Sequence, residues 1–424
     1  MIKKIKKFLL IIFLLFELIS FNFYFVQSDD LENDTTNINS NIVNSLETSS
    51  TEISEKIPTT NSRSCVVIDR LTKQILYGKN ENNQVKMAST TKIMTAIIVI
   101  ENGNLDKTTE ISKKAAMTGG SRLGLKTNDK ITIYDLLYGL LLCSGNDAAV
   151  ALAEYVAGGV PEFADLMNQK AIALGLGNTK FESPHGLDSD NHYTTAYELA
   201  LLTDYALNNS TFAKIVKTKK YTVTINGSPK SLNNTNELLG NLDGVYGVKT
   251  GFTNGANRCL VSSCKRNDMD IICVVLGADT KKFRTQDSIK LIEYTFKNFE
   301  HMDIKPLIEQ ELLNCKQKYN NIYIYKGNPE YITFNILNLE NTIITINKTE
   351  KNNIKTISYI NDKISVPIYK NSTPIGYIKV ICGNETIENI DIISNVSVFK
   401  KTWIDYFAYF LKNSLNSYSN CLKF

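Results

Sequence analysis

The stretch Met87-Ala88-Ser89-Thr90-Thr91-Lys92 leads directly into an apolar run, Ile93 to Ile100, which ends before Asn102-Gly103. This pattern predicts a buried helix that begins near Ser89. Residues three apart lie on one helix face, so Ser89 and Lys92 are expected to be neighbours. A hydroxyl with an amine and free backbone N–H groups nearby has the components of an activated nucleophile. The stretch alone still favours an ordinary N-cap serine, because the same Ser-x-x-Lys spacing occurs twice more in the chain.

Two further strings supply chemical partners for Ser89 and Lys92. Ser144-Gly145-Asn146 falls in a short break between two predicted helices, and Lys249-Thr250-Gly251, which occurs once, ends a strand-like segment. Ser-x-x-Lys, Ser-x-Asn and Lys-Thr-Gly in this order are the signature of penicillin-binding proteins and class A β-lactamases. A neutral lysine can take the proton of the serine, and burial together with a second cation lowers a lysine pKa from about 10.4.

Each remaining member of the three strings has a chemical role in this scheme. Ser144 can relay a proton to the leaving amine, and Asn146 can hold the lysine and a substrate amide. Lys249 and Thr250 can hold a substrate carboxylate. The strand that continues through Gly251 offers its edge to an extended peptide. The oxyanion hole is expected to consist of the backbone N–H groups of Ser89 and Phe252.

The chain resembles the low-molecular-mass penicillin-binding proteins that act as serine-type D-alanyl-D-alanine carboxypeptidases. The resemblance covers about residues 63–395 and rests on four extended motifs: Lys86-Met87-Ala88-Ser89-Thr90-Thr91-Lys92-Ile93-Met94-Thr95, Ser144-Gly145-Asn146-Asp147-Ala148-Ala149, Ser183-Pro184-His185-Gly186-Leu187-Asp188 and Lys249-Thr250-Gly251-Phe252-Thr253.

The resemblance implies removal of the terminal D-alanine from peptidoglycan pentapeptides through a Ser89 acyl-enzyme, with β-lactams as covalent inhibitors. It also implies that Arg284, on the last helix, helps bind the terminal carboxylate. Arg258 is a rival for that role, although its position favours solvent exposure. His185 is interpreted as an organiser of the 183–188 loop. The resemblance implies no metal and no organic cofactor.

Composition agrees with an exported globular protein. The net charge of +4 over 424 residues argues against a dedicated nucleic-acid binder. Four lysines before residue 8 and an apolar stretch through Val26 predict a signal peptide over residues 1–28, with an uncleaved anchor as the alternative. The body is then expected at the extracytoplasmic face of a bacterial membrane. None of the eight cysteines forms Cys-x-x-Cys, and with three histidines no zinc spacing is visible.

The patterns along the chain predict three folded parts after a disordered linker over 29–62. An initial hairpin, central helices, later strands and a last helix predict an α/β (α+β) transpeptidase-like domain over 63–300, with helices covering one antiparallel sheet. Short alternating segments predict a small all-β domain over 307–395. Residues 396–415 carry Phe399, Trp403, Tyr406 and Phe410 at helical spacing, with lysines nearby. This stripe predicts an amphipathic helix that lies on a membrane surface, the alternative being a helix packed on the β domain.

Three other functions remain open from the sequence. A class A β-lactamase deacylates with a glutamate from a Glu-x-x-x-Asn loop. Between Asn146 and Lys249 only Glu237–Asn241 has that spacing, and it lies too close to Lys249 to form the loop. Penicillin is therefore expected to form a long-lived adduct. A non-catalytic peptidoglycan-binding or drug-sensing protein would keep the fold without the chemistry. A peptidoglycan endopeptidase would use the same residues.

Overall fold

The computed structural model describes residues 56–421 except 338 and 340, and the chain divides into two compact units between Lys297 and Asn298. The predicted signal peptide and linker residues 29–55 lie outside the described residues. Ser62, which we assigned to the linker, is fully buried, and its N–H donates to the Asp287 carboxylate at 2.8 Å. The folded part of the first unit therefore begins before residue 63. Among the residues described, no helix is both long and apolar enough to cross a bilayer.

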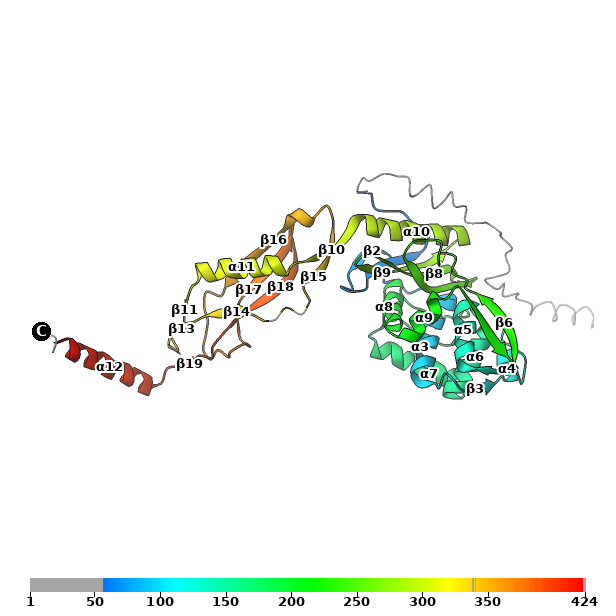
Figure 1. The fold of residues 1–424 in the computed structure, drawn as a ribbon, viewed down its shortest axis with the longest axis horizontal. Helices are drawn as coiled ribbons and strands as arrows, with labels where there is room; N and C mark the ends of the chain where they lie inside the picture. The colour runs from blue at the N-terminus through cyan, green and yellow to red at the C-terminus, as the bar shows by residue number, and fades with distance from the viewer. Residues whose placement is uncertain (1–55, 338, 340, 422–424) are drawn as a thin grey trace, which may run out of the picture. The chain divides into compact units, whose positions relative to one another are not determined.

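A five-stranded sheet organises the first unit (Figure 1). Every neighbouring pair in it is antiparallel, and the central β9 and β8 consist almost wholly of buried side chains. The initial hairpin was predicted from two short apolar runs on either side of a polar turn. In order across the sheet, the strands are β2 (Ile75–Lys79), β1 (Ser64–Asp69), β9 (Met269–Ala278), β8 (Asn257–Arg266) and β7 (Val245–Thr253).

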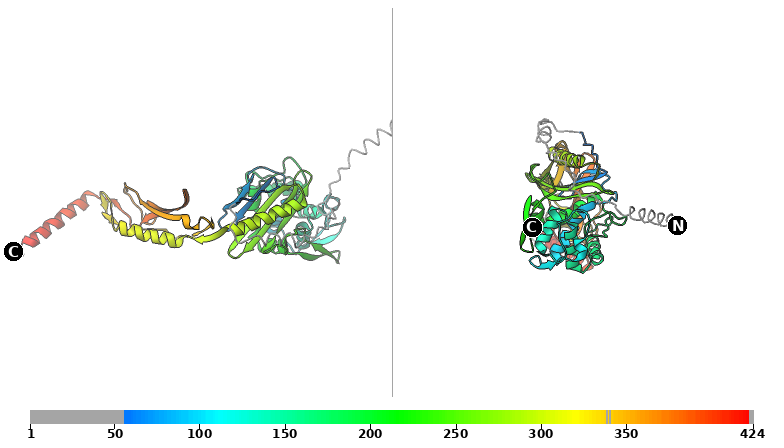
Figure 2. Two further views of the ribbon diagram at one scale, coloured as in Figure 1. Left: turned by 90° about the horizontal axis from the view of Figure 1, so that it is seen from above. Right: turned by 90° about the vertical axis from the view of Figure 1, so that its right-hand side faces the viewer.

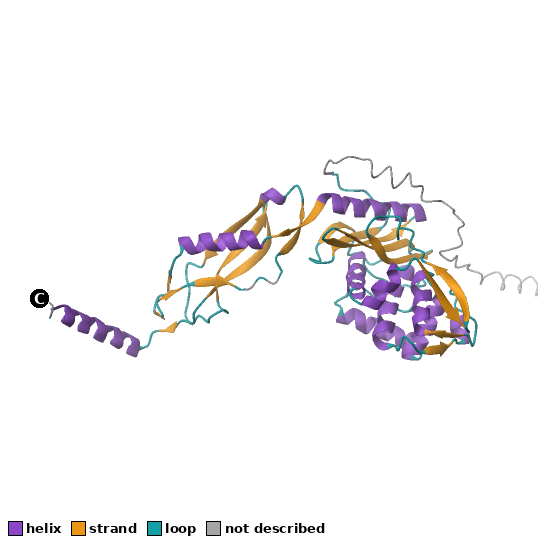
Figure 3. Cartoon of the chain, viewed as in Figure 1, coloured by secondary structure: helices purple, strands orange, loops and turns teal. Residues whose placement is uncertain are grey.

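Helices cover both faces of this sheet, as Figure 3 shows most plainly. The last helix of the unit, α10 (Lys281–Asn298), lies across one face, which the left view of Figure 2 shows from above. The other helices gather on the opposite face. These are α3 (Lys92–Asn102), α4 (Lys113–Ala116), α5 (Ile133–Leu142), α6 (Asn146–Ala157), α7 (Val160–Ala173), α8 (Ala196–Leu207) and α9 (Ser210–Lys217).

Helix α3 is the centre of the helical layer. Its residues from Lys92 through Val99 are all buried, so it is apolar on every side, as a helix enclosed by others must be. A short 3-10 turn, η1 (Ala88–Thr91), precedes it, and the chain leaves it at Gly103. The predicted buried helix is thus confirmed, and Ser89 lies in the turn that leads into it.

Strand β7 is an edge strand, because the sheet ends there. It contacts η1. Two small hairpins lie outside the sheet: β3 (Thr108–Glu110) with β4 (Lys130–Thr132), and β5 (Lys220–Ile225) with β6 (Ser228–Asn233). The segment Tyr221 to Ile225 was expected to be a strand, and it pairs with β6 instead of joining the large sheet.

The second unit has its own apolar core between a four-stranded antiparallel sheet, ordered β14-β18-β17-β16, and helix α11. The strands of the predicted all-β domain over 307–395 are confirmed by this sheet. The sequence analysis missed α11, although Ile308, Leu312 and Cys315 are buried at steps of four and three. Its elements are β10 (Phe299–Asp303), α11 (Lys305–Lys318), β11 (Ile322–Tyr323), β12 (Gly327–Asn328), β13 (Tyr331–Ile332), β14 (Phe334–Ile336), β15 (Ile343–Asn347), η2 (Lys351–Asn353), β16 (Ile354–Ile360), β17 (Pro374–Cys382), β18 (Glu385–Ser394), β19 (Phe399–Lys400) and α12 (Trp403–Cys421).

The C-terminal helix α12 begins later than the sequence pattern suggested. Phe399, which we placed in its aromatic stripe, instead lies in β19 and pairs with Asn328 of β12. Thr402 directly precedes the helix, and its N–H donates to the Asp405 carboxylate in the first turn at 2.6 Å. Trp403 and Phe410 are 76% and 64% exposed, so the aromatic side chains of α12 are not covered by the described part of the chain.

Candidate active site

Lys92 and Ser89 meet at the junction of η1 and α3. Lys92 Nζ lies 2.8 Å from Ser89 Oγ, 2.8 Å from Asn146 Oδ1 and 2.8 Å from the backbone oxygen of His185. Lys92 is fully buried and Ser89 is 8% exposed. The amine of the lysine therefore joins the serine, the Ser-x-Asn string and the 183–188 loop in one place.

The turn that carries Ser89 has an unusual backbone. Ala88, directly before Ser89, has φ +48°, which an L-residue rarely adopts. Such conformations persist only where the surroundings impose them, and they concentrate at functional sites. Here the surroundings are β7: a Cβ added at Gly251 would lie 3.0 Å from Ser89 N and 3.2 Å from the Ala88 Cβ. A larger residue at this position of the Lys-Thr-Gly strand would force η1 or β7 to shift by a few tenths of an ångström.

The Ser-x-Asn string lies between the end of α5 and the start of α6. Ser144 has φ +61° and is fully buried, and its Oγ has no hydrogen-bond partner among the described residues. Asn146 opens α6. Its Oδ1 faces Lys92, and its Nδ2 donates to the Gly119 carbonyl at 2.7 Å. The amide is therefore oriented, while the buried serine hydroxyl remains available.

The Lys-Thr-Gly string lies on the edge strand β7. Lys249 is 1% exposed and its Nζ donates to the Thr250 carbonyl at 2.9 Å. The Thr250 hydroxyl lies 2.7 Å from the hydroxyl of Thr235. Phe252, further along the strand, is half-buried beneath Arg258, whose guanidinium lies 3.8 Å from the ring centroid. Arg258 is 7% exposed, so our expectation that it faces solvent was wrong.

Arg284 is also buried, on α10, and it is already ion-paired. Its Nη2 donates to Glu237 Oε1, and the Thr285 hydroxyl donates to the same oxygen. Arg284 Nε and Glu237 Oε2 have no hydrogen-bond partner within the described part of the chain. Burial alone would raise the pKa of Glu237, but the charge of Arg284 and the two hydrogen bonds outweigh it and lower the pKa.

The 183–188 loop fits tightly against η1. Gly186 has φ +87°, and a Cβ there would lie 2.0 Å from the Ala88 backbone oxygen. The His185 carbonyl accepts from Lys92, and its Nδ1 accepts from the Leu187 N–H at 3.2 Å. Burial, with the nearby Lys92 charge, lowers the pKa of His185 to about 3. His185 thus lies in the loop as a neutral ring.

Sequence reasoning missed His192, which links the loop region to the serine turn. Its Nδ1 accepts from the Glu182 N–H at 3.0 Å, so the proton of the neutral ring lies on Nε2. That nitrogen lies 2.7 Å from Thr91 Oγ1, and the Thr91 hydroxyl donates to the Ala88 carbonyl at 2.8 Å. The chain of bonds ends at the strained residue before Ser89. A lone histidine carries no sequence signal of this role.

Asp147, the residue after Asn146, was quoted only as part of a motif. Its buried carboxylate accepts backbone N–H groups of Leu123, Gly124 and Leu125 at 2.7 to 2.9 Å. A carboxylate with several N–H donors is a strong anchor for a loop. It holds the 119–125 segment against the start of α6, where Gly119 supports Asn146.

Ser-x-x-Lys at the start of a buried helix, Ser-x-Asn between two helices and Lys-Thr-Gly on an edge strand together define the class of penicillin-binding proteins and serine β-lactamases. Residues 51–280 match the peptidase S11 model, described as D-alanyl-D-alanine carboxypeptidase, and residues 309–400 match the C-terminal domain of penicillin-binding protein 5. The chain belongs to the D-alanyl-D-alanine carboxypeptidase family, whose members are serine hydrolases.

Relatives and solved structures agree with this assignment. D-alanyl-D-alanine carboxypeptidase DacF of Bacillus subtilis is 35% identical over 73% of this chain and 79% of its own length. The crystal structure of DacD from Francisella tularensis is 28% identical, with a TM-score of 0.68 over 84% of this chain and 98% of that chain. The crystal structure of penicillin-binding protein 5 from Haemophilus influenzae is 28% identical, with a TM-score of 0.66 over 82% of this chain and 100% of that chain.

Proposed function

We propose that this protein removes the terminal D-alanine from peptidoglycan pentapeptides through an acyl-enzyme on Ser89, with Lys92 as the general base. The observation that carries the proposal is the set of contacts of Lys92. Asn146 Oδ1 and the His185 carbonyl can only accept hydrogen bonds. Lys92 Nζ also lies 2.8 Å from Ser89 Oγ, so the neutral amine is within reach of the hydroxyl proton.

Acylation follows from this arrangement. Ser89 Oγ bonds to the carbonyl carbon of the penultimate D-alanine while Lys92 takes the hydroxyl proton. The tetrahedral oxyanion is expected to bind the N–H groups of Ser89 and Phe252. The C–N bond then breaks, and the proton passes from Lys92, through Ser144, to the leaving amine. The buried, unpartnered hydroxyl of Ser144 supports its role as that relay.

Deacylation uses the same lysine with water in place of the serine. Water adds to the ester carbonyl while Lys92 takes one of its protons, and the proton returns to Ser89 Oγ as the ester bond breaks. Each cycle therefore consumes one peptide bond and one water and restores the enzyme.

The substrate carboxylate is assigned to Lys249, Thr250 and Arg284. The cationic side chains of Lys249 and Arg284 are buried, and buried cations bind a carboxylate more strongly than exposed ones. Arg284 retains an unpartnered Nε–H beside its pair with Glu237. The edge of β7 that no strand pairs with in the described sheet, at Gly251 and Phe252, is assigned to the peptide backbone.

A labelled penicillin tests the nucleophile and separates the enzyme from a β-lactamase. We expect a stable adduct whose mass is that of the protein plus the drug, with the label on the peptide that contains Ser89. Ser89→Ala should abolish it. Ser262→Ala is the matched control, because Ser262 also precedes a lysine by three residues and is a buried serine with an unpartnered hydroxyl, but lies in β8. Rapid turnover of penicillin would contradict the assignment.

Release of D-alanine from a pentapeptide separates the carboxypeptidase from a protein that only binds peptidoglycan or drugs. Wild-type protein should release D-alanine continuously, and Ser89→Ala should not. Drug labelling without D-alanine release would favour the drug-sensing alternative.

We further propose that the protein is exported and that α12 lies on the outer surface of the cell membrane. The support is the exposure of large apolar side chains along α12, among them Trp403, Phe410 and Leu415 at 64–76%. Aromatic side chains favour the headgroup layer, and Lys400 and Lys412 suit anionic lipids, whereas Lys401 is ion-paired with Glu330. Sedimentation with anionic vesicles should retain the full chain and lose a variant that ends at Thr402. Equal sedimentation of both would refute the role of α12.

A further inference from the structure

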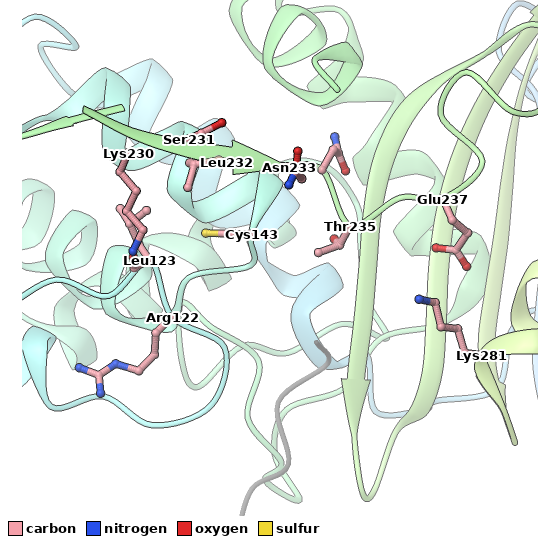
Figure 4. A pocket seen from close by; sticks show the side chains of 11 residues that line it. Arg122, Leu123, Cys143, Lys230, Ser231, Leu232, Asn233, Thr235, Glu237 and Lys281 are labelled. Atoms are coloured by element: carbon pink, nitrogen blue, oxygen red, sulfur yellow. The ribbon is translucent and has the colours of Figure 1, made fainter. Parts of the chain in front are cut away.

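A cavity of 460 Å³ opens beside the proposed active site, within the first unit. Figure 4 shows Arg122, Leu123 and Lys230 on one side of it, Glu237 and Lys281 on the other, and Cys143 between them. Cys143 directly precedes Ser144 in the chain. The cavity therefore adjoins the proposed proton relay but is lined by none of Ser89, Lys92 and Lys249.

The cavity lies on the side of the site where the leaving group is expected. Thr235 and Glu237 line it. Thr235 bonds to Thr250, and Glu237 bonds to Arg284. Thr250 and Arg284 are the residues assigned to the terminal carboxylate of the substrate. A residue released by the enzyme would thus have its carboxylate at Thr250 and Arg284, with its side chain beside the cavity.

The lining of the cavity contains cationic side chains that no acidic residue in the described part of the chain neutralises. Arg122 donates to the Ala116 carbonyl and Lys230 to the Leu123 carbonyl, which are neutral acceptors. Neither they nor Lys281 forms an ion pair with any residue that the structure describes. The acidic member of the lining, Glu237, is neutralised by Arg284. The lining therefore carries three positive charges without an acidic partner among the described residues, around a space that has the volume of an ordinary ligand site.

We propose that this cavity is a leaving-group subsite for a residue larger than D-alanine that carries a second carboxylate. A methyl side chain uses little of the space and none of the charge, whereas an acidic side chain matches both. The enzyme then also cleaves the bond between D-alanine and an acidic D-residue. Ser89 Oγ bonds to the D-alanine carbonyl, the C–N bond to the acidic residue breaks, and the leaving amine takes the serine proton. Water then hydrolyses the ester. The inference rests on the proposed function.

The test compares four acyl-peptides that end in D-Ala-D-Ala, D-Ala-D-Glu, D-Ala-D-Gln and D-Ala-D-Lys. The ratio of kcat/KM for the D-Glu peptide to that for the isosteric D-Gln peptide isolates the charge. We expect the D-Glu peptide to exceed the D-Gln peptide by about fivefold and the D-Lys peptide by more than about tenfold, because like charges are excluded from the cavity. Lower ionic strength should increase both ratios.

Variants locate the effect. Lys281→Gln and Lys230→Gln should each reduce the ratio of D-Glu to D-Gln cleavage severalfold. Lys282→Gln, which changes a neighbouring exposed lysine outside the lining, should leave the ratio at its wild-type value. D-alanine release with no preference for D-Glu, or a preference that survives both lining variants, would overturn the inference and leave the proposed function intact. Absence of both D-alanine release and the penicillin adduct would overturn the proposed function itself.

Discussion

Protonation of His192 should destabilise the protein in mild acid. The ring accepts an N–H at Nδ1 and contacts Thr91 through Nε2. Burial is the main cause that lowers the pKa of His192 to about 4, and the charges of Glu182 and Asp188 oppose the shift. A proton on Nδ1 would face the Glu182 N–H and break that bond. The cation is therefore disfavoured by its contacts as well as by burial.

The magnitude follows from the difference between folded and unfolded states. The unfolded chain binds a proton near pH 6.5, and the folded chain does so only near pH 4. Between these values the unfolded state holds more protons, so stability falls as the pH falls. The stabilisation is fully present above pH 6.5. From about pH 7 to about pH 4.5, His192 alone should cost about 2 kcal/mol of the free energy of unfolding, at about 1.4 kcal/mol per unit of pKa difference.

Urea unfolding of wild-type protein and of His192→Asn, at both pH values, measures this contribution. Asparagine keeps an acceptor for the Glu182 N–H and cannot be protonated. On acidification, the free energy of unfolding of the variant should fall by about 2 kcal/mol less than that of the wild type. His185, whose pKa is also lowered by burial, contributes to both proteins and cancels in the difference. His301→Asn, in β10 of the second unit, controls for histidine removal in general.

Two results would refute the reasoning on His192. One is an equal acid loss in wild type and His192→Asn. The other is an NMR titration that places the His192 pKa near 6.5 in the folded protein.

Two further substitutions test how the serine turn and the 119–125 segment are held. Gly186→Ala places a Cβ 2.0 Å from the Ala88 oxygen, so it should destabilise the fold by about 2 kcal/mol or more and slow penicillin acylation. Gly175→Ala is the control, because Gly175 has φ +73° but nothing lies within 4 Å of its added Cβ. It should lower the free energy of unfolding by about 1 kcal/mol and leave acylation unchanged. Equal effects of the two substitutions would show that the backbone conformation alone matters and that the contact with Ala88 does not. Asp147→Asn weakens three bonds to Leu123–Leu125, so urea unfolding should show a loss of about 3 kcal/mol, and no loss would contradict its anchoring role.

The sequence by itself determined the helix that carries Lys92, the initial hairpin and the reactive groups. The apolar run after Lys92 predicts a buried helix because a helix enclosed by other elements is apolar on every side. The spacing of Ser89 and Lys92 places the hydroxyl beside the amine because residues three apart lie on one helix face. The initial hairpin can be predicted from the local sequence, but the edge position of the Lys-Thr-Gly strand cannot. The hairpin is visible as two short apolar runs around a polar turn, whereas only the order of strands in the sheet leaves β7 with an open edge.

Only the tertiary structure decided which distant residues support the site. The contact of His192 with Thr91 spans 101 residues, and that of Glu237 with Arg284 spans 47. No periodicity records such pairs, because their geometry depends on how whole elements pack. The same applies to Arg258, whose guanidinium covers Phe252 across two paired strands instead of facing water. Residue identity and spacing along the chain specify which side chains can react. Packing specifies which residues hold and orient those side chains and where a cavity lies beside them.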